Sequence, residues 1–226
     1  ERILGISKKY NIPVIEDAAH ALGAQYAGQK MGKHFPFTVY SFQAIKHLTT
    51  IDGGALQISD FTLYEKGKLI RWFGLDKNID RLQNNITLQG FKYHMNNVNA
   101  TIGLVQLENI EEVLATYIAN GQYLDKYLQG IEGVELISYY DKSIPSYWLY
   151  TLKVENRKGF IKMMRENGIL ASELHQRNDH HAYLNDFPST LPNLDAFYEK
   201  MVHIPCGWWV SRGDCDKMIE LIKKGW

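Results

Sequence analysis

The feature that most constrains the fold is a short apolar run that turns acidic at its carboxyl end. Residues 13–17 read Pro-Val-Ile-Glu-Asp, and the run closes on Asp17. Similar runs occur at 38–41, which ends in Ser41, and at 54–58. Runs of this length predict buried strands. With helices between them they indicate an α/β fold, in which ligands bind beyond the carboxyl ends of the strands.

The rest of the chain alternates between helical and extended patterns. Helical periodicity and end signals predict helices at residues 2–10, 61–72, 96–118 with a continuation to 128, 157–167 and 214–224. Half-exposed strands are predicted at 134–138, 147–154 and 171–174, and a polar surface loop at 76–90. The pattern changes near residue 118. We therefore expect a large α/β domain over residues 1–118 and a smaller α+β domain over 119–226.

Composition excludes several classes of function. The chain has 226 residues, with 25 basic and 25 acidic side chains. This balance gives no electrostatic reason to bind nucleic acid or an anionic membrane surface. No apolar run reaches the ~18 residues that a membrane span needs. The only two cysteines, Cys206 and Cys215, suggest reduced thiols in a cytoplasmic protein. The histidine-rich stretch 173–181 lacks a spacing suited to a metal site, and we expect none.

One lysine stands between two predicted strands. In the segment 39–59, Val-Tyr-Ser-Phe-Gln-Ala-Ile-Lys-His-Leu-Thr-Thr-Ile-Asp-Gly-Gly-Ala-Leu-Gln-Ile-Ser, Lys46 follows the strand that ends at Ser41. An amine near the carboxylate of Asp17 suits pyridoxal phosphate (PLP), whose aldehyde forms a Schiff base with lysine. A carboxylate opposite the pyridine nitrogen raises the pKa of that nitrogen and keeps it protonated. The same residues also fit an unrelated α/β enzyme that uses a lysine without a cofactor.

Five segments, quoted in chain order, strengthen the cofactor interpretation. They are VIEDAAHALGAQYAGQKMG, YSFQAIKHLTTIDGGAL, RWFG, GFKYHMNNVNATIGLVQL and HIPCGWW. In order and spacing they resemble the sugar-nucleotide aminotransferases of the DegT/DnrJ/EryC1/StrS family, which are fold-type I PLP enzymes. The resemblance implies the C-terminal part of the large mixed-sheet PLP domain, followed by a smaller α+β C-terminal domain. Family members are longer, so we expect the N-terminal portion of the large domain to be missing from this sequence.

The resemblance also implies roles for five residues. Lys46 matches the lysine that forms the Schiff base, and Asp17 matches the aspartate that faces the pyridine nitrogen. His20 matches the residue beside the cofactor's phenolic oxygen. Ser41 matches a serine that contacts the phosphate, and Gln43 lies beside it in the same segment.

The segment Gly-Phe-Lys-Tyr-His-Met departs from the family pattern, Gly-x-Asn-Tyr-Arg-Met. Lys92 stands at the Asn position and His94 at the Arg position. In the family this segment reaches the active site of the neighbouring subunit, with the Asn position near the phosphate. The resemblance therefore implies a homodimer with composite active sites. Lys92 could bind the cofactor's phosphate as a point charge, and His94 is expected on the substrate side.

The C-terminal half contributes the remaining candidate residues. By resemblance, the stretch 173–181 borders the substrate cleft, where His175, Arg177 and Asn178 would meet a nucleotide diphosphate. The expected reaction is transamination of a nucleotide-linked keto sugar with glutamate or glutamine as amino donor, giving an amino sugar nucleotide. A catalytically silent regulatory or binding protein of the same fold is the alternative.

Overall fold

The structure, a computed structural model, describes residues 1–226 and divides them into two compact units. Unit 1 comprises residues 1–111 and 142–144, and unit 2 comprises residues 112–141 and 145–226. The change between units at 111–112 lies inside the long helix in which the sequence places a domain boundary at 118. Each unit is described separately below.

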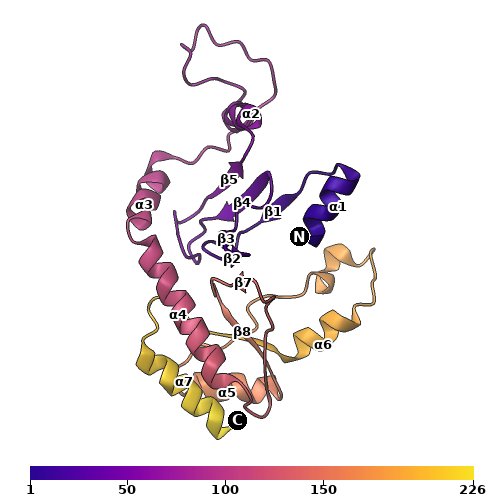
Figure 1. The fold of residues 1–226 in the computed structure, drawn as a ribbon, viewed down its shortest axis with the longest axis vertical. Helices are drawn as coiled ribbons and strands as arrows, with labels where there is room; N and C mark the ends of the chain where they lie inside the picture. Colours follow the sequence, from indigo (N-terminus) through magenta and orange to yellow (C-terminus); the bar gives the residue numbers. More distant parts are fainter. The chain divides into compact units, whose positions relative to one another are not determined.

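Unit 1 is built on a small mixed sheet (Figure 1). Its elements are α1 (Arg2–Tyr10), β1 (Ile15–Asp17), β2 (Gln25–Tyr26), β3 (Gln29–Lys30), β4 (Phe37–Ser41), β5 (Gly54–Ile58), α2 (Phe61–Arg71), α3 (Asn97–Leu107) and β7 (Ser143–Ile144). The main sheet has the order β1-β4-β5, with β1 parallel and β5 antiparallel to β4. A second sheet has the order β3-β2-β7. Mixed pairing of this kind confirms the α/β class.

The register of the main sheet decides which residues share a face. Asp17 pairs with Val39, and Ser41 pairs with Gly54. Because successive side chains of a strand alternate between faces, Asp17 and Ser41 lie on one face of the sheet and Glu16 on the other.

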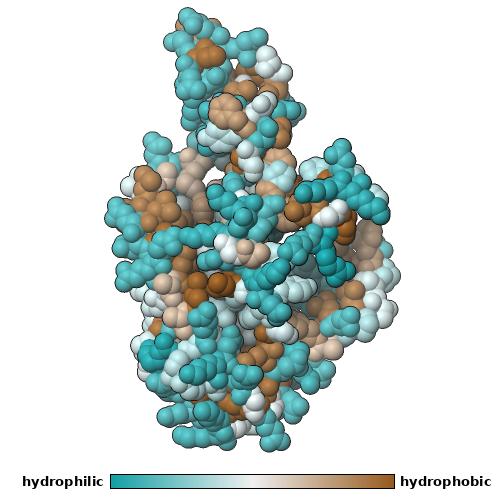
Figure 2. All heavy atoms as spheres, viewed as in Figure 1, coloured by the Kyte–Doolittle hydropathy of each residue, from teal (hydrophilic) through white to brown (hydrophobic).

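The polar loop at 76–90 contains neither helix nor strand, as predicted. It follows α2, and Figure 2 shows its surface, at the top of the view, as mostly hydrophilic with a few apolar side chains. Leu82 belongs to this loop, and its side chain is 96% exposed.

The prediction of one helix over 96–118 is wrong. Helix α3 ends at Leu107, and α4 (Ile110–Leu128) begins three residues later. At the break, the amides of Glu108 and Asn109 bond to carbonyls three residues back. This tighter 3₁₀ pattern interrupts the helix, although apolar periodicity continues through it.

Unit 2 is an α+β unit with an antiparallel sheet of order β6-β8-β9. Besides α4 its elements are β6 (Val134–Leu136), β8 (Tyr150–Val154), α5 (Arg157–Glu166), η1 (Asn178–His180), η2 (Ala182–Leu184), α6 (Pro192–Lys200), β9 (Met201–Ile204) and α7 (Arg212–Lys224). One face of β8, formed by Tyr150, Leu152 and Val154, is buried in a core with side chains from α4, α5 and α7.

Two expectations for unit 2 need correction. The strand predicted at 171–174 is reduced to one bridge between Ser172 and His203. Strand β6 is half exposed, as predicted, but β8 is less exposed than expected, because it alternates between buried and half-buried residues. Helix α6 and β9 were not predicted, since the apolar pattern there is short and irregular.

None of the helices combines the length and apolar character that crossing a membrane requires.

Candidate active site

Asp17 closes β1 at the carboxyl edge of the parallel pair β1-β4. The amide of Ala18 donates to the carbonyl of Val39 at 2.9 Å, so the paired strands stay together to the end of β1. One carboxylate oxygen of Asp17, Oδ1, accepts from the amide of Ala19 at 3.0 Å. The carboxylate itself is exposed, and His20 lies three residues on in the turn that leaves the strand, also exposed. The sequence therefore places an acid where ligands of α/β sheets bind.

Lys46 lies in the loop 42–53, which connects β4 to β5. Local hydrogen bonds shape its first half: the Ser41 hydroxyl accepts from the amide of Gln43 at 3.4 Å, and the Gln43 carboxamide accepts from Ile45 at 3.1 Å. The amide of Lys46 then donates to the carbonyl of Gln43 at 2.9 Å. Ser41 and Gln43 thus help to hold the turn that presents the half-buried Lys46.

The second half of the loop is fastened to Phe42, at the start of the loop, and to α3. Amides of Thr50 and Phe42 donate to the carbonyls of Phe42 and Gly53, each at 2.9 Å. The carbonyl of Asp52 accepts from the Thr50 hydroxyl at 2.8 Å and from the Asn99 carboxamide of α3 at 2.9 Å. Gly53 has φ of 144°, and a Cβ there would lie 2.7 Å from the Thr50 hydroxyl. The loop therefore needs glycine at this turn.

Two further glycines allow close packing around the loop. A Cβ at Gly54 would lie 2.5 Å from the backbone carbonyl oxygen of Tyr40. A Cβ at Gly103, on α3, would lie 2.8 Å from the methyl group of Thr50. Since backbone cannot yield as a flexible side chain can, Gly54 is the more demanding of the two positions.

Lys46 and Asp17 interact electrostatically. Burial lowers the pKa of the Lys46 amine, and the negative charge of Asp17 raises it with a smaller effect. The net shift is downward, which increases the fraction of neutral, nucleophilic amine. The structure thus brings an amine, a carboxylate and the Ser41 hydroxyl to one edge of one sheet.

Comparison with models of protein families shows to which family the chain belongs. The model of the DegT/DnrJ/EryC1/StrS aminotransferase family matches residues 1–223. The chain belongs to this family. Membership confirms the resemblance and the fold-type I assignment drawn from the sequence.

Relatives of this DegT/DnrJ/EryC1/StrS chain include transaminases that act on sugars. A UDP-4-amino-4,6-dideoxy-N-acetyl-beta-L-altrosamine transaminase from Campylobacter jejuni is 28% identical, over 100% of this chain and 64% of the relative. The crystal structure of the sugar aminotransferase CalS13 from Micromonospora echinospora has a TM-score of 0.90 and 38% identity, over 97% of this chain and 61% of that one.

A third similar structure is the PLP form of the putative sugar aminotransferase Spr1654 from Streptococcus pneumoniae. It has a TM-score of 0.83 and 25% identity, over 97% of this chain and 59% of that one. The chain thus spans about three-fifths of the length of these relatives.

The segment that departs from the family pattern lies beside the end of α2. Lys92 pairs with Trp72 in an antiparallel bridge, and the ring of His94 meets that of Trp72 edge-on, with centroids 4.0 Å apart. Burial lowers the pKa of His94, and the positive charges of Lys77, Lys92 and Arg71 lower it further. Lys92 and His94 therefore belong to a basic cluster around Trp72, and their contacts with cofactor and substrate stay predictions.

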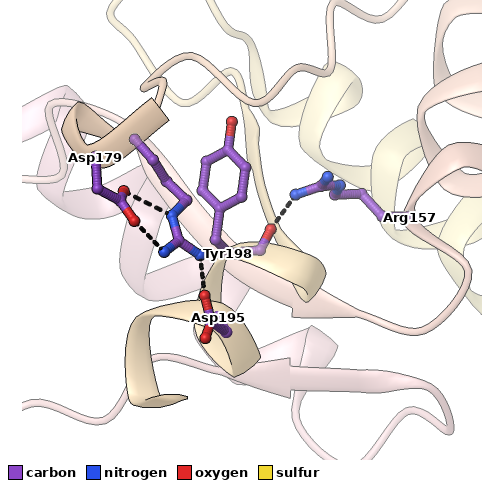
Figure 3. A network of polar contacts seen from close by, with 5 residues as sticks. Arg157, Asp179, Asp195 and Tyr198 are labelled. Carbon is purple, nitrogen blue, oxygen red and sulfur yellow. Dashed lines mark hydrogen bonds and ion pairs between the residues drawn. The ribbon is translucent and has the colours of Figure 1, made fainter. Parts of the chain in front are cut away.

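Arg177 of unit 2 is already engaged by two carboxylates (Figure 3). Its guanidinium donates to Asp179 at 2.9 and 2.5 Å and also to Asp195. These bonds raise the pKa of Arg177 and lower that of Asp179. The Arg177 side chain is only 9% exposed and links η1 to α6. A contact with a diphosphate would have to replace one of these ion pairs, so the substrate role of Arg177 stays a prediction.

The other two candidates of unit 2, His175 and Asn178, come shortly before and after Arg177 along the chain. The ring of His175 is 5.9 Å from Trp148 and 5.5 Å from His203, measured between centroids. Asn178 is exposed and opens η1. Their contacts with substrate are likewise predictions.

Sequence reasoning missed the residues that support the lysine loop. Asn99 and Gly103 lie one turn apart on α3, facing Asp52 and Thr50. A glycine inside an otherwise apolar helix was an available signal, because such a position is unfavourable unless close packing requires it.

Proposed function

We propose that the protein is a PLP-dependent aminotransferase that transfers an amino group to a keto sugar carried on a nucleotide diphosphate. The observation that carries this proposal is the placement of Lys46 and Asp17 at one sheet edge, close enough for the charge of Asp17 to act on the amine. Family membership and the sugar transaminases among the relatives support it.

The residues at this edge fit PLP by their chemistry. Lys46 would hold the aldehyde of the cofactor, and Asp17 the protonated ring nitrogen. The Ser41 hydroxyl would donate to the phosphate, beside Gln43, and His20 would lie near the phenolic oxygen. The positively charged side chain of Lys92 would also contact the phosphate of the cofactor. When bound, PLP supplies an electron sink for the carbon that loses a proton.

Lys46 would have a second role with PLP and the amino donor bound. Its amine would act as general base and then general acid, carrying the proton that the α-carbon of the donor loses. The lowered pKa of Lys46 favours this role, because more of the amine is unprotonated near neutral pH. The negative charge of Asp17 would keep the ring nitrogen of bound PLP protonated.

The relatives support a nucleotide-sugar substrate, and the sequence suggests the amino donor and the assembly. The amino donor would be glutamate or glutamine, and the product an amino sugar nucleotide. His94, His175, Arg177 and Asn178 are the candidates for binding the sugar nucleotide. The working unit would be a homodimer with composite sites. A cytoplasmic location is expected from two cysteines that are both unpaired.

Replacing Lys46 tests the proposal. Lys46→Ala should abolish the visible absorbance of lysine-bound PLP and all transamination, whereas the control Lys33→Ala, at an exposed lysine, should keep both. Parent-like turnover in Lys46→Ala would refute the assignment. Addition of glutamate to the PLP-loaded parent should change its absorbance. Binding of PLP without that change would favour the silent binding protein.

A further inference from the structure

A buried carboxylate lies directly behind Asp17. Glu16 is 8% exposed and points to the opposite face of β1, because successive strand residues alternate. Its Oε2 accepts from the amide of Gly32 and from the hydroxyl of Thr38, both at 3.1 Å. Its Oε1 is buried and accepts no hydrogen bond. Burying a carboxylate that is only half satisfied is unfavourable, so the position calls for an explanation.

The contacts of Glu16 are part of a network that joins all three strands of the sheet. The carbonyl of Gly32 accepts from the Gln57 carboxamide of β5 at 2.5 Å, and the carbonyl of Met31 accepts from the Tyr40 hydroxyl of β4 at 2.8 Å. Gly32 has φ of 94°, and a Cβ there would lie 2.2 Å from the Tyr40 hydroxyl. We call Glu16, Gly32, Thr38, Tyr40 and Gln57 the rear polar layer.

The rear polar layer bears on the register of β1. This strand has only three residues, so few backbone hydrogen bonds hold it against β4. A slip of one residue would turn Glu16 to the front and Asp17 to the rear. Thr38 and Glu16 are paired directly across the two strands, and the Thr38 hydroxyl donates to the Glu16 carboxylate. This hydrogen bond would be lost if β1 slipped along β4.

We propose that Glu16 is a positioning residue for Asp17: through Thr38 and Gly32 it fixes β1 against β4, and so fixes the Asp17 carboxylate relative to the Lys46 amine. This inference rests on the proposed roles of Asp17 and Lys46. Glu16 acts by geometry, since the carboxylate whose charge acts on Lys46 is that of Asp17.

The test measures Lys46 directly, without turnover. In the cofactor-free full-length protein, the rate at which Lys46 is acylated is followed against pH by peptide mass spectrometry, which reports the pKa of the amine. Asp17→Asn sets the scale and should lower this pKa, because it removes the charge that raises it. PLP affinity is measured in parallel by absorbance titration.

Two nearly isosteric variants separate geometry from charge. Thr38→Val removes the hydroxyl donor but keeps both carboxylates. It should lower the Lys46 pKa in the same direction as Asp17→Asn and weaken PLP binding roughly tenfold or more, since small misplacements are costly in such sites. Glu16→Gln keeps an oxygen acceptor but removes the charge, and should leave the Lys46 pKa near that of the parent. Val202→Ala, in the core of unit 2, controls for loss of stability alone.

The result for Thr38→Val decides the matter. A lowered Lys46 pKa in this variant, with none in Val202→Ala, supports positioning. A parent-like Lys46 pKa in Thr38→Val overturns the inference while leaving the proposed function standing, provided that Asp17→Asn does lower it. If the pKa of Lys46 in Asp17→Asn were like that of the parent, the proposed interaction between Asp17 and Lys46 would be refuted, and this inference with it.

Discussion

Acid should destabilise unit 2 through one buried histidine. His203, on β9, is 7% exposed; its Nδ1 lies 3.0 Å from the Thr151 hydroxyl, and its Nε2 is buried without a hydrogen bond. Burial, with a smaller contribution from the charge of His175, lowers the pKa of His203 from 6.5 to about 4. The folded unit therefore holds this imidazole neutral.

The sign and size of the effect follow from proton linkage. Between pH 6.5 and about 4 the unfolded chain binds a proton at position 203 that the folded chain does not. Stability is therefore fully present above pH 6.5 and falls as pH drops toward 4. The whole difference corresponds to ~3 kcal/mol, of which ~2 kcal/mol is lost by about pH 5.

Denaturant unfolding followed by tryptophan fluorescence can measure this loss. Four of the five tryptophans lie in unit 2, the exception being Trp72. The perturbation is His203→Asn, which keeps a polar group near Thr151 but does not titrate. Between about pH 7.5 and about pH 5 the parent should lose ~2 kcal/mol more stability than this variant. His181→Asn, at an exposed histidine, is the matched control and should follow the parent. Equal losses in the parent and His203→Asn would refute the reasoning.

Two further predictions concern a buried hydrogen-bonded group of unit 2 and a close backbone contact of unit 1. Asp125→Ala removes the acceptor of the Tyr147 and Tyr150 hydroxyls, now bonded at 2.5 and 2.8 Å. It should destabilise unit 2 by ~2–4 kcal/mol in denaturant unfolding, because two buried donors lose their partner. Gly54→Ala places a methyl group against the Tyr40 carbonyl. It should destabilise unit 1 by ~1–3 kcal/mol and weaken PLP binding, as measured by circular dichroism and absorbance titration.

Each of these has a control in the chain. Asp125→Asn keeps an oxygen acceptor and should recover part of the lost stability. Gly5→Ala, in α1, meets no atom within 4 Å and should not destabilise unit 1. If Asp125→Ala unfolded like the parent, the stabilising role of its two hydrogen bonds would be refuted. If Gly54→Ala did so, the need for glycine beside the Tyr40 carbonyl would be refuted.

Much of the local structure was predictable because it depends on short-range patterns. Helix α1 ends at Tyr10 and is capped by Asn11, which has φ of 50°, and β5 has the predicted bounds of Gly54–Ile58. Apolar periodicity failed where a local hydrogen-bond change decided the outcome, as at Glu108 and Asn109. It also failed for residues 171–174, where pairing with β9 is limited to one bridge.

The sequence by itself determined the family, the fold class and the candidate amine and acid, since Asp17 and Lys46 each stand in a recognisable segment. It also placed Asp17 at a strand end, because the apolar run stops there. Only the tertiary structure decided that β1 and β4 are parallel and that Glu16 and Thr38 share the rear face. The same holds for Asp195, which lies 18 residues along the chain from Arg177 and accepts a hydrogen bond from its guanidinium. The physical reason is that pairing register and ion pairing join residues distant along the chain, and no short-range pattern encodes such contacts.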